Sequence, residues 1–372
     1  MFIQFHDSFT KGCFTAADLF ENFKYPATHK NSINETQFLY GEHEHNVLES
    51  VQGDSRYYHR LDKLGKTWWI LANRLQKYHE NFLEDGNFKV LGASARGHDD
   101  LYSFQAQSPH TEVLASPLTT PTGALNLVTK LLESHCPATF MSATCLSVAS
   151  AIEMALHSPD PKHLIFSGEC VGSEFKRKMF KDLGVFQKTW HGNFANKSFA
   201  ADRDGMVLGD GASVLAFSKQ KTPNSQVEVL GVQTLRDPQV SLTGMAKPRA
   251  ITSCIDKLLE KVGVSRNEVN CVIGHGSATK QGDAFELKAY EQYFQRNIPK
   301  LLSTKWLSGH ILGGSMGLSI VLACEMMRQN DLLEMPYPIE FKEYTYPQKL
   351  QYFLVGGMGY NGQVAFVLLK RV

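Results

Sequence analysis

Apolar positions along this chain fall into two kinds of pattern. Short apolar runs, such as His163–Val171 and Asn270–Gly274, have the length of buried strands. Longer segments such as Pro248–Val262 carry apolar residues three and four positions apart, which is the spacing of a helix that buries one face. Strand and helix patterns follow one another along the chain. This alternation predicts an α/β fold with a largely parallel sheet.

Most of the chain can be assigned to an element, although residues 24–60 are polar and show no clear period. For that stretch we expect loops and short helices. Trp68 and Trp69 lie on the apolar stripe of one predicted helix, so core packing is their expected role. The predicted strands are Phe2–Phe5, Phe88–Ala93, Thr139–Met141, His163–Val171, Val214–Phe217, Gln226–Thr234, Asn270–Gly274, Leu301–Thr304, Tyr352–Gly356 and Gln363–Leu369. The predicted helices are Thr15–Phe23, Leu61–Phe82, Gly123–Glu133, a helix ending near His157, Pro248–Val262, Gly282–Phe294 and Gly314–Gln329.

The segment Pro137–Pro159 holds the first candidate for chemistry. A short apolar run, Thr139–Met141, passes through small residues into a helical pattern that should end near His157. Cys145 lies where the strand turns into the helix, so its sulfur would face unpaired N–H groups and the helix dipole, which favour a thiolate. A single cysteine beside apolar residues is also typical of core packing. Cys145 is therefore a candidate nucleophile that needs partners elsewhere in the chain.

Composition narrows the functional classes. The 372 residues are 43% hydrophobic and 20% charged, which is ordinary for a folded soluble protein. A net charge of +1 gives no overall argument for binding nucleic acid or a membrane. The seven cysteines are scattered without CxxC or metal-ligand spacing, so we expect a reducing cytoplasm and no structural metal. We expect no targeting segment at the N-terminus and no membrane span, because no apolar stretch is long enough.

Four segments of the chain resemble motifs of one enzyme family. The first, Phe199–Phe217, reads FAADRDGMVLGDGASVLAF. It resembles the segment RPFDxxRDGFVxGEGAxVL of the β-ketoacyl synthases, the decarboxylating condensing enzymes of fatty acid and polyketide synthesis. Its glycines permit tight turns and close backbone approach, so we expect a structural role for this stretch. It departs from the family pattern at Lys197, Ser198, Ala200, Met206 and Asp210.

Two histidines lie in two further motifs of this family. His275 lies in GHGSATKQGDAFE, which resembles GHGTGTxxGDxxE, with Ser277 in place of Thr and Ala278 in place of Gly. His310 lies in STKWLSGHILGGSMG, which is close to SxKxxxGHxxGAAG. A lone histidine at a strand end is more often structural, but two of them in separate motifs, after a cysteine at a helix start, favour a shared site. In the second motif Gly314, Ser315 and Met316 replace the final Ala-Ala-Gly.

The fourth segment, Gly356–Gly362, reads GGMGYNG and is similar to the GFGGxN loop of the family. Aligned on Asn361 without a gap, it puts Gly357 where a gating Phe usually lies. A one-residue gap puts Met358 there instead. The resemblance covers roughly Ala138 to the C-terminus and is weak over the first hundred residues.

The family resemblance implies a thiolase-like fold, in which two similar α/β halves form a layered α-β-α-β-α architecture. On that basis residues 1–220 would form an N-terminal half that carries Cys145. Residues 221–372 would form a C-terminal half that carries His275 and His310. The implied activity is that of a β-ketoacyl-ACP synthase, which condenses an acyl chain with a malonyl-type thioester by a decarboxylative Claisen reaction.

The resemblance also implies catalytic roles. Cys145 would accept the acyl group, and the backbone N–H groups of Cys145 and of Met358 or Gly357 would form an oxyanion hole. His275 and His310 would donate hydrogen bonds to the enolate that forms when the malonyl group loses carbon dioxide. No metal or organic cofactor is expected, because the substrates are carried on phosphopantetheine of acyl carrier protein or on CoA.

Four polar residues are expected to support this chemistry. Lys305 and Glu286 could form an ion pair that orients His275, and a purely structural salt bridge is an equal alternative. Ser277 and Thr279 would hydrogen-bond the pantetheine arm, as their counterparts in the family do.

The expected partners are acyl carrier protein and a second subunit, in a homodimer or a heterodimer with another ketosynthase-like chain. Acyl carrier protein is acidic, so basic residues on the surface could steer it to the site. Nucleic acid and membrane are not expected partners. The basic residues considered for carrier docking are Lys63, Lys66 and Lys197, together with Arg60 and Lys176–Lys178.

Other functions stay open at this point. The chain could be a catalytically silent subunit, similar to a chain-length factor, that shapes a ketosynthase heterodimer. A starter-type synthase or a thiolase fits less well, because those enzymes use Cys-His-Asn and Cys-His-Cys triads. A Cys-His acyl-thioester hydrolase would also use a thiolate at a helix start.

Overall fold

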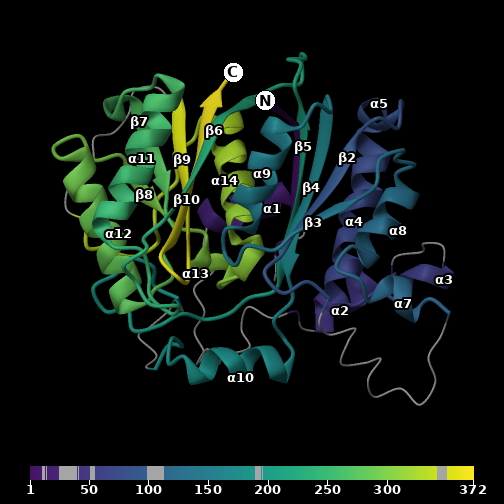
Figure 1. The fold of residues 1–372 in the computed structure, drawn as a ribbon, viewed down its shortest axis with the longest axis horizontal. Coiled ribbons are helices and arrows are strands. Elements are labelled where there is room, and N and C mark those ends of the chain that lie inside the picture. The colour runs from purple at the N-terminus through teal and green to yellow at the C-terminus, as the bar shows by residue number, and fades with distance from the viewer. Residues whose placement is uncertain are drawn as a thin grey trace.

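The computed structural model describes residues 1–10, 13, 15–24, 40, 42–50, 55–98, 113–188, 194, 196–341 and 350–372. Within these residues, ten strands form one twisted sheet in the order β3-β2-β4-β5-β1-β6-β10-β9-β7-β8 (Figure 1). The strands are β1 (Phe2–Thr10), β2 (Lys89–Ala93), β3 (Thr139–Met141), β4 (Lys162–Glu169), β5 (Gly211–Ser218), β6 (Val227–Arg236), β7 (Val269–Ile273), β8 (Lys300–Leu302), β9 (Tyr352–Gly359) and β10 (Gln363–Arg371).

The helices of the described residues pack on both faces of this sheet. The shorter ones are α1 (Ala16–Lys24), α2 (Glu42–Ser50), α3 (Ser55–Tyr58), α5 (Glu80–Leu83), α7 (Ala115–Leu118), α8 (Gly123–Leu131), α10 (Glu174–Asp182) and α13 (Lys305–Ser308). The longer ones are α4 (Lys63–Tyr78), α9 (Ser147–His157), α11 (Pro248–Val262), α12 (Lys280–Phe294) and α14 (Ser315–Gln329). Two 3-10 turns are η1 (Arg266–Glu268) and η2 (Leu312–Gly314).

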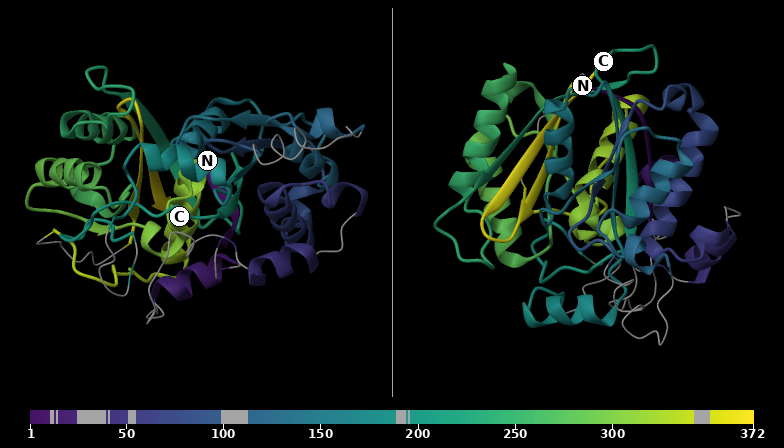
Figure 2. Two further views of the ribbon diagram at one scale, coloured as in Figure 1. Left: turned by 90° about the horizontal axis from the view of Figure 1, so that it is seen from below. Right: turned by 45° about the vertical axis from the view of Figure 1, so that its right-hand side comes forward.

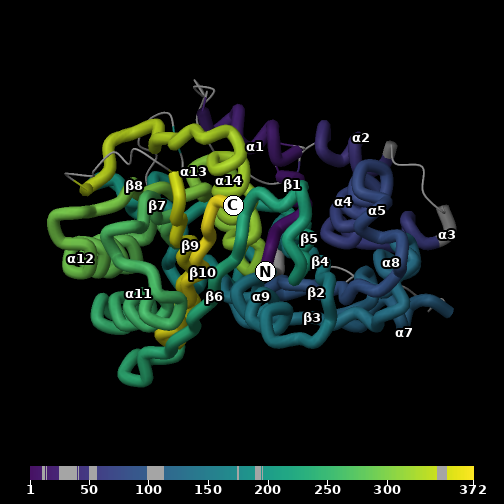
Figure 3. Tube along the Cα trace, turned by 90° about the horizontal axis from the view of Figure 1, so that it is seen from above, coloured from purple at the N-terminus to yellow at the C-terminus, as the bar shows by residue number. Residues whose placement is uncertain are grey.

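The elements stack in five layers, α-β-α-β-α, as the resemblance implied. Helices α9 and α14 lie in the middle and contact strands from both ends of the sheet. Helices α11 and α12 cover one outer face, and α4 and α8 cover the other (Figures 1 and 3). The sheet therefore folds around two buried central helices, and the thiolase-like architecture is confirmed.

The sheet order keeps the two parts of the chain apart. Strands β1–β5 occupy one end of the order and β6–β10 the other. They meet where Phe2 and Ile3 of β1 pair with Glu228 and Val227 of β6. The division near residue 220 stays a prediction, because a sheet order does not show that either part forms a separate domain.

The prediction of a largely parallel sheet is wrong. The pairs β2–β3, β2–β4, β7–β8 and β7–β9 are parallel, whereas β4–β5, β5–β1, β1–β6, β6–β10 and β10–β9 are antiparallel. Strands β9 and β10 follow one another through a short turn, and such a hairpin can pair only in the antiparallel sense. Alternation of apolar patterns indicates that strands exist but does not give their directions.

Three apolar clusters account for the layers. The central cluster joins α9 and α14 to the inner faces of the strands, and residues such as Ile152 and Leu318 are fully buried in it. A second cluster lies under α4 and α8 and contains Trp68 and Trp69, whose predicted core role is confirmed by exposures of 0% and 4%. A third cluster lies under α11 and α12.

Helix α10 was not predicted from the sequence. Its sequence EFKRKMFKD is short and strongly polar, with Lys or Arg at four of its nine positions, so no apolar run marks it as an element. Ser173 caps its first turn, because the side chain accepts a hydrogen bond from the Lys176 backbone N–H. The helix lies outside the five layers and crosses the end of the molecule where the site described below is found (Figures 1 and 2). Among the described residues, no helix is both long and apolar enough to cross a membrane.

Candidate active site

Cys145 lies in the tight turn between β3 and α9. Thr144 has a positive φ of 53°, which folds the chain sharply at the end of the strand. The Ser147 hydroxyl accepts a hydrogen bond from the Ala143 N–H and donates one to the Thr144 carbonyl. Cys145 therefore sits in a hydrogen-bonded turn two residues before α9 begins, and it stays half-buried while the helix behind it is packed in the core.

His310 is held by the segment Phe199–Phe217. The His310 N–H donates to the Val207 carbonyl, and the Gly209 N–H donates to the His310 carbonyl. A side chain on Gly209 would collide with the backbone, since a Cβ there would lie 1.9 Å from the Ser308 carbonyl oxygen. The glycine-rich motif thus has the structural role expected from the sequence, because residues just before β5 hold the loop that carries His310.

His275 is held through its backbone. Glu286 accepts hydrogen bonds from the N–H groups of His275 at 2.6 Å and Gly276 at 2.9 Å, and Tyr290 donates to the same carboxylate at 2.5 Å. The Lys305 ammonium donates to the His275 carbonyl from the other side. The predicted ion pair between Lys305 and Glu286 does not form, because each group is directed at the peptide backbone of His275.

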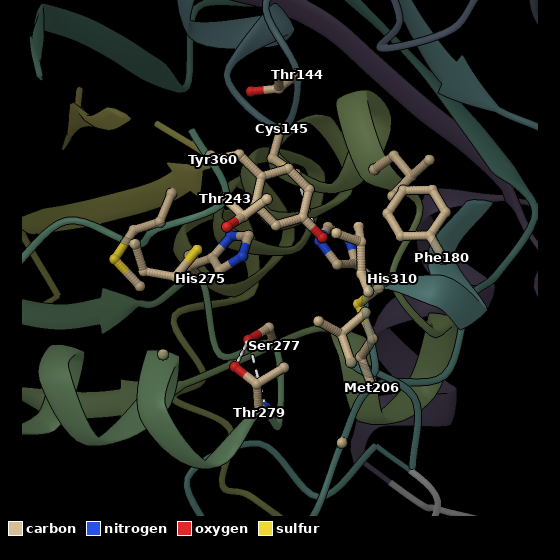
Figure 4. A pocket seen from close by; sticks show the side chains of 18 of the residues that line it. Thr144, Cys145, Phe180, Met206, Thr243, His275, Ser277, Thr279, His310 and Tyr360 are labelled. Carbon is tan, nitrogen blue, oxygen red and sulfur yellow. Dashed lines mark hydrogen bonds between the residues drawn. The ribbon is translucent and has the colours of Figure 1, made fainter. Parts of the chain in front are cut away.

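Cys145 and the two imidazoles converge on one cavity (Figure 4). The Cys145 Sγ lies 3.5 Å from the His310 Nε2. The rings of His275 and His310 have centroids 5.1 Å apart and planes inclined at 78°. The sulfur and one nitrogen of each ring lie within 4.8 Å of one another. A single carbonyl or enolate oxygen can therefore contact all three side chains.

Burial controls the charge of these groups. It lowers the pKa values of His275 and His310 well below 6.5, and the nearby Lys305 lowers them further. Both imidazoles are neutral at neutral pH, so each has one N–H donor and one acceptor nitrogen. Burial also lowers the pKa of Lys305 to about 8, although Cys145 and Glu286 oppose this.

The resting sulfur of Cys145 is a thiol. Burial raises its pKa to about 11, and the opposing effect of Lys305 is smaller. The thiolate expected from the helix start is thus outweighed by desolvation. Attack on a thioester requires a base for the thiol proton, and the His310 Nε2 is the nearest one.

The cavity has a volume of about 960 Å³. Met358 lines it, and Gly357 lies against the Cys145 carbonyl, since a Cβ on Gly357 would be 3.5 Å from that oxygen. Both positions proposed for the second oxyanion donor are therefore next to the nucleophile. Ser277 and Thr279 also line the cavity, with their hydroxyls 2.9 Å apart. Their predicted contacts with pantetheine stay a prediction.

The basic residues predicted to dock a carrier lie away from the cavity lining. Lys66 pairs with Glu49, and Lys197 pairs with Asp202 at 2.6 Å. Lys63 begins α4 and does not line the cavity either. Lys176 is buried and donates to the Cys170 carbonyl, so its proposed place on a docking surface is wrong. Docking by Lys63, Lys66 and Lys197 stays a prediction.

Several residues of the cavity were missed from the sequence. Tyr360 lies two positions after Met358 in the fourth motif. Ser315 does not line the cavity but contacts the His310 ring at 3.0 Å, and in the His310 motif it was noted only as a departure from the family pattern. Their motifs were the available signal. Arg96 and Phe180 come from segments outside any motif, and Met206 was noted only as a departure from the family pattern.

All seven cysteines are free thiols, and five of them are buried. Cys145 and Cys136 are the two that reach the half-buried class. Among the described residues, Cys145, His275 and His310 also form the one group of His, Cys, Asp and Glu whose ligand atoms are close enough to bind a metal ion. The expectation that the site works without metal or cofactor stays a prediction.

Comparison with known proteins agrees with the motifs. Residues 227–335 match the family model of the beta-ketoacyl synthase C-terminal domain. The chain is 32% identical over 133 residues to the chloroplastic 3-oxoacyl-[acyl-carrier-protein] synthase I of Arabidopsis thaliana, a match that covers 34% of this chain and 28% of that protein. It is 26% identical over 198 residues to 3-oxoacyl-[acyl-carrier-protein] synthase 2 of Coxiella burnetii, over 48% and 47% of the two chains. The chain thus matches less than half the length of either relative.

Solved structures match the whole chain. A beta-ketoacyl synthase from Burkholderia phymatum has a TM-score of 0.80 at 16% identity and covers 100% of this chain and 99% of its own. The ishigamide ketosynthase/chain length factor has a TM-score of 0.78 at 14% identity, with coverages of 100% and 98%. A type II polyketide ketosynthase solved in complex with its acyl-carrier protein, AntDE:AntF, has a TM-score of 0.78 at 16% identity, with coverages of 100% and 98%. At these identities the likeness shows the ketosynthase fold.

Proposed function

The chain carries the C-terminal domain of the β-ketoacyl synthase family on the full ketosynthase fold, and from this we propose that it is a β-ketoacyl-ACP synthase. It would extend an acyl chain held on Cys145 by decarboxylative condensation with a malonyl-type thioester, in fatty acid or polyketide biosynthesis. The observation that carries the proposal is the convergence of the Cys145 sulfur with the rings of His275 and His310 in one cavity.

The first step loads the acyl chain. His310 Nε2 takes the proton of the Cys145 thiol, and the sulfur attacks the carbonyl of an acyl thioester. The tetrahedral oxyanion is stabilised by backbone N–H groups of Cys145 and of Met358 or Gly357. The carrier thiolate leaves and takes the proton from His310. The chain is then held as a thioester on Cys145.

The second step makes the carbon–carbon bond. A malonyl-type thioester loses carbon dioxide, and the electron pair of the broken bond forms an enolate. His275 and His310 are neutral, so each can stabilise the enolate oxygen through one ring N–H. For His310 this is the tautomer with the hydrogen on Nε2 and the Ser315 hydroxyl donating to Nδ1, the reverse of the tautomer that takes the thiol proton. The enolate carbon attacks the acyl carbonyl, and the Cys145 thiolate leaves. The product is a β-ketoacyl thioester that is two carbons longer.

Lys305 and Glu286 act on this chemistry through His275. Glu286 accepts a hydrogen bond from the His275 N–H, and Lys305 donates one to the His275 carbonyl. The backbone of His275 is therefore fixed on both sides of the ring. Ser277 and Thr279 line the same cavity and would hold the pantetheine arm. Acyl carrier protein is the proposed carrier, and a second ketosynthase-like subunit is the proposed partner. The similar solved structures include a ketosynthase in complex with its acyl-carrier protein and a ketosynthase/chain length factor.

Two measurements test the function. Intact-mass spectrometry after incubation with hexanoyl-ACP should show one hexanoyl group on the chain, and Cys145→Ser should abolish it. Cys136→Ser is the matched control, because Cys136 is the other half-buried cysteine, and it should load normally. Addition of malonyl-ACP should then release carbon dioxide and a β-ketooctanoyl product.

Other outcomes of these measurements would overturn the proposal. A chain that gains no acyl mass, alone or with a co-purified subunit, would be a silent subunit of the chain-length-factor kind. Release of free hexanoic acid without any product that depends on malonyl-ACP would indicate an acyl-thioester hydrolase.

A further inference from the structure

A short loop after β2 places Arg96 at the rim of the cavity. The buried carboxylate of Glu169 holds this loop, since it accepts hydrogen bonds from the Ser94 hydroxyl at 2.9 Å, the Ala95 N–H at 2.8 Å and the Arg96 N–H at 3.3 Å. The Ser142 hydroxyl donates to the Ala95 carbonyl at 3.0 Å. The backbone of Arg96 is therefore fixed, and its exposed side chain is part of the cavity lining.

A second turn places Tyr360 in the same cavity. Arg236 donates to the carbonyl and the side-chain oxygen of Asn361, and the Gly362 N–H donates to the Gly244 carbonyl. These bonds fix the turn between β9 and β10. Figure 4 draws the Tyr360 side chain among Cys145, His275 and His310. The phenol is thus a rigidly placed donor close to the reacting groups.

Neither donor is used by the protein within the described residues. The Arg96 guanidinium has no ion pair or hydrogen bond there, and the Tyr360 hydroxyl has no hydrogen-bond partner there. Both groups line the same cavity. Burial raises the pKa of Tyr360 to about 12, and Arg96 opposes this rise. Arg96 also slightly opposes the raised pKa of Cys145. The Tyr360 hydroxyl is therefore protonated at neutral pH and can donate.

The surroundings favour an acyl chain beside these donors. Ala95, next to Arg96, and Tyr360 both pack against a small apolar cluster that contains Phe180, Met206 and Leu312. These apolar side chains form one wall of the cavity. Other charged residues of the lining are Lys188, Lys280, Asp182 and Asp204, so the lining as a whole has no large excess of either charge.

We propose that the Arg96 guanidinium and the Tyr360 hydroxyl form a carboxylate-binding subsite beside Cys145. This inference rests on the proposed function and names its substrate class. The apolar part of an acyl chain would lie against Phe180, Met206 and Leu312. A carboxylate at the far end of that chain would then bind to Arg96. The same two donors could instead bind the carboxylate of the malonyl-type extender. The experiments below distinguish the carboxylate of the acyl chain from that of the extender.

The first measurement compares loading of two chains of equal length. Cys145 of the unchanged protein should be acylated faster by adipoyl-CoA than by hexanoyl-CoA. Arg96→Gln should lower the adipoyl-to-hexanoyl ratio of rates at least tenfold, and Tyr360→Phe should lower it by a smaller factor. Arg249→Gln is the matched control, because Arg249 is exposed at the start of α11 and does not line the cavity. It should leave the ratio unchanged within twofold.

The second measurement follows the extender. If the carboxylate is that of the malonyl group, Arg96→Gln should raise the KM for malonyl-CoA at least tenfold in carbon dioxide release and leave the loading ratio unchanged. Either result supports the subsite, and the two measurements together show whether it binds the carboxylate of the acyl chain or that of the extender. The subsite is refuted if Arg96→Gln changes neither quantity by more than twofold.

A binding measurement keeps this test separate from the proposed function. In the Cys145→Ser background, calorimetry should show adipoyl-CoA or malonyl-CoA binding more tightly than hexanoyl-CoA or acetyl-CoA respectively, with the preference lost in Arg96→Gln. If the unchanged protein loads no acyl group at all, the proposed synthase activity fails, and this preference still decides the subsite. Equal binding of acidic and neutral thioesters would reject it.

Discussion

The two histidines of the site are held in different ways. His310 has a contact at each ring nitrogen, with Cys145 at 3.5 Å and Ser315 at 3.0 Å. His275 is fixed through its peptide groups by Glu286 and Lys305, and its ring lines the cavity. The two rings therefore differ in function: His310 can serve the sulfur and the substrate, whereas His275 can serve the substrate.

This difference predicts separable effects of mutation. His275→Ala should lower condensation by about 10² to 10³-fold, because one donor to the enolate is lost, while loading of Cys145 persists. His310→Ala should lower condensation by a similar factor and also slow loading, because the thiol loses its base. Intact-mass time courses and malonyl-dependent product formation measure the two steps. Full-rate condensation by either variant would contradict the assigned role.

Ser315 is predicted to position the His310 ring. The Ser315 hydroxyl can accept from Nδ1–H while Nε2 is the base for the thiol, and it can donate to Nδ1 when Nε2 carries the hydrogen that the enolate oxygen needs. Ser315→Ala leaves that buried nitrogen without its hydroxyl, and a lost buried hydrogen bond of about 1 kcal/mol corresponds to roughly a fivefold slower loading step. The pH profile of loading should shift as well, which a packing defect would not cause. Ser319→Ala, one turn along α14, is the control and should change neither quantity.

His163 predicts how the stability of the fold depends on pH. It is buried at the start of β4 with both ring nitrogens lacking hydrogen bonds, and burial lowers its pKa to about 4. The unfolded chain binds the proton near pH 6.5, so the folded state loses stability as pH falls from about 6.5 towards 4. The loss from this residue at pH 5 is about 2 kcal/mol.

Urea unfolding at pH 7.5 and pH 5 measures this effect. His163→Met should reduce the difference in unfolding free energy between the two pH values. His157→Gln, at the exposed end of α9, should leave that difference as it is. An unchanged pH dependence in His163→Met would show that other groups control it.

At the residue scale, the sequence predicted the groups that lie in motifs. Cys145 and His275 were identified because each follows a strand within a local pattern, and His310 because it lies in a motif of its own. Arg96 has no such pattern, and its place in the cavity depends on the distant Glu169 that holds its loop. Lys176 was assigned to the surface because the charge of a residue does not reveal that a carbonyl and a carboxylate surround it in the fold.

At the scale of elements, helix limits were predicted best where a proline or a glycine marks the end of the helix. Helix α11 begins at Pro248 and ends before Gly263, whose φ of 69° suits glycine. Strand β1 runs to Thr10, past the predicted end at Phe5, because Asp7 and Ser8 are buried polar residues that break the apolar pattern. The directions of the strands could not be predicted from the apolar pattern, because they depend on pairing between distant segments.

The close contact between Gly209, just before β5, and the loop that carries His310 gives a prediction at this scale. Gly209→Ala should lower the free energy of unfolding by about 1 to 3 kcal/mol, because its Cβ would force the Ser308 carbonyl away. It should also slow loading of Cys145, since the displaced loop carries His310. Gly172→Ala is the control, because the nearest atoms to its Cβ would be 3.8 Å away. Equal stability of the two variants would show that the loop adapts without cost.

At the scale of the whole molecule, the two parts of the sheet are interlocked by their central helices. Helix α9 comes from the first part of the chain but contacts β6 and β10, and α14 comes from the second part but contacts β1, β4 and β5. The central apolar cluster therefore contains residues of both parts. Neither part can bury its inner face alone.

This arrangement predicts one cooperative unfolding transition. Variants that keep a single tryptophan, either Trp68 in α4 or Trp306 in α13, should report the same urea midpoint by fluorescence. Far-UV circular dichroism should give that midpoint too. Two separate midpoints would indicate that residues 1–220 and 221–372 unfold independently.

The distribution of thiols has a practical consequence. Five cysteines are enclosed by the fold, so a bulky maleimide added to the native protein can reach only Cys145 and Cys136. In a Cys136→Ser background, one equivalent of label would then count competent catalytic centres in a preparation. Protection of that single position by a bound thioester would turn the label into a direct assay of occupancy, without any need to follow product.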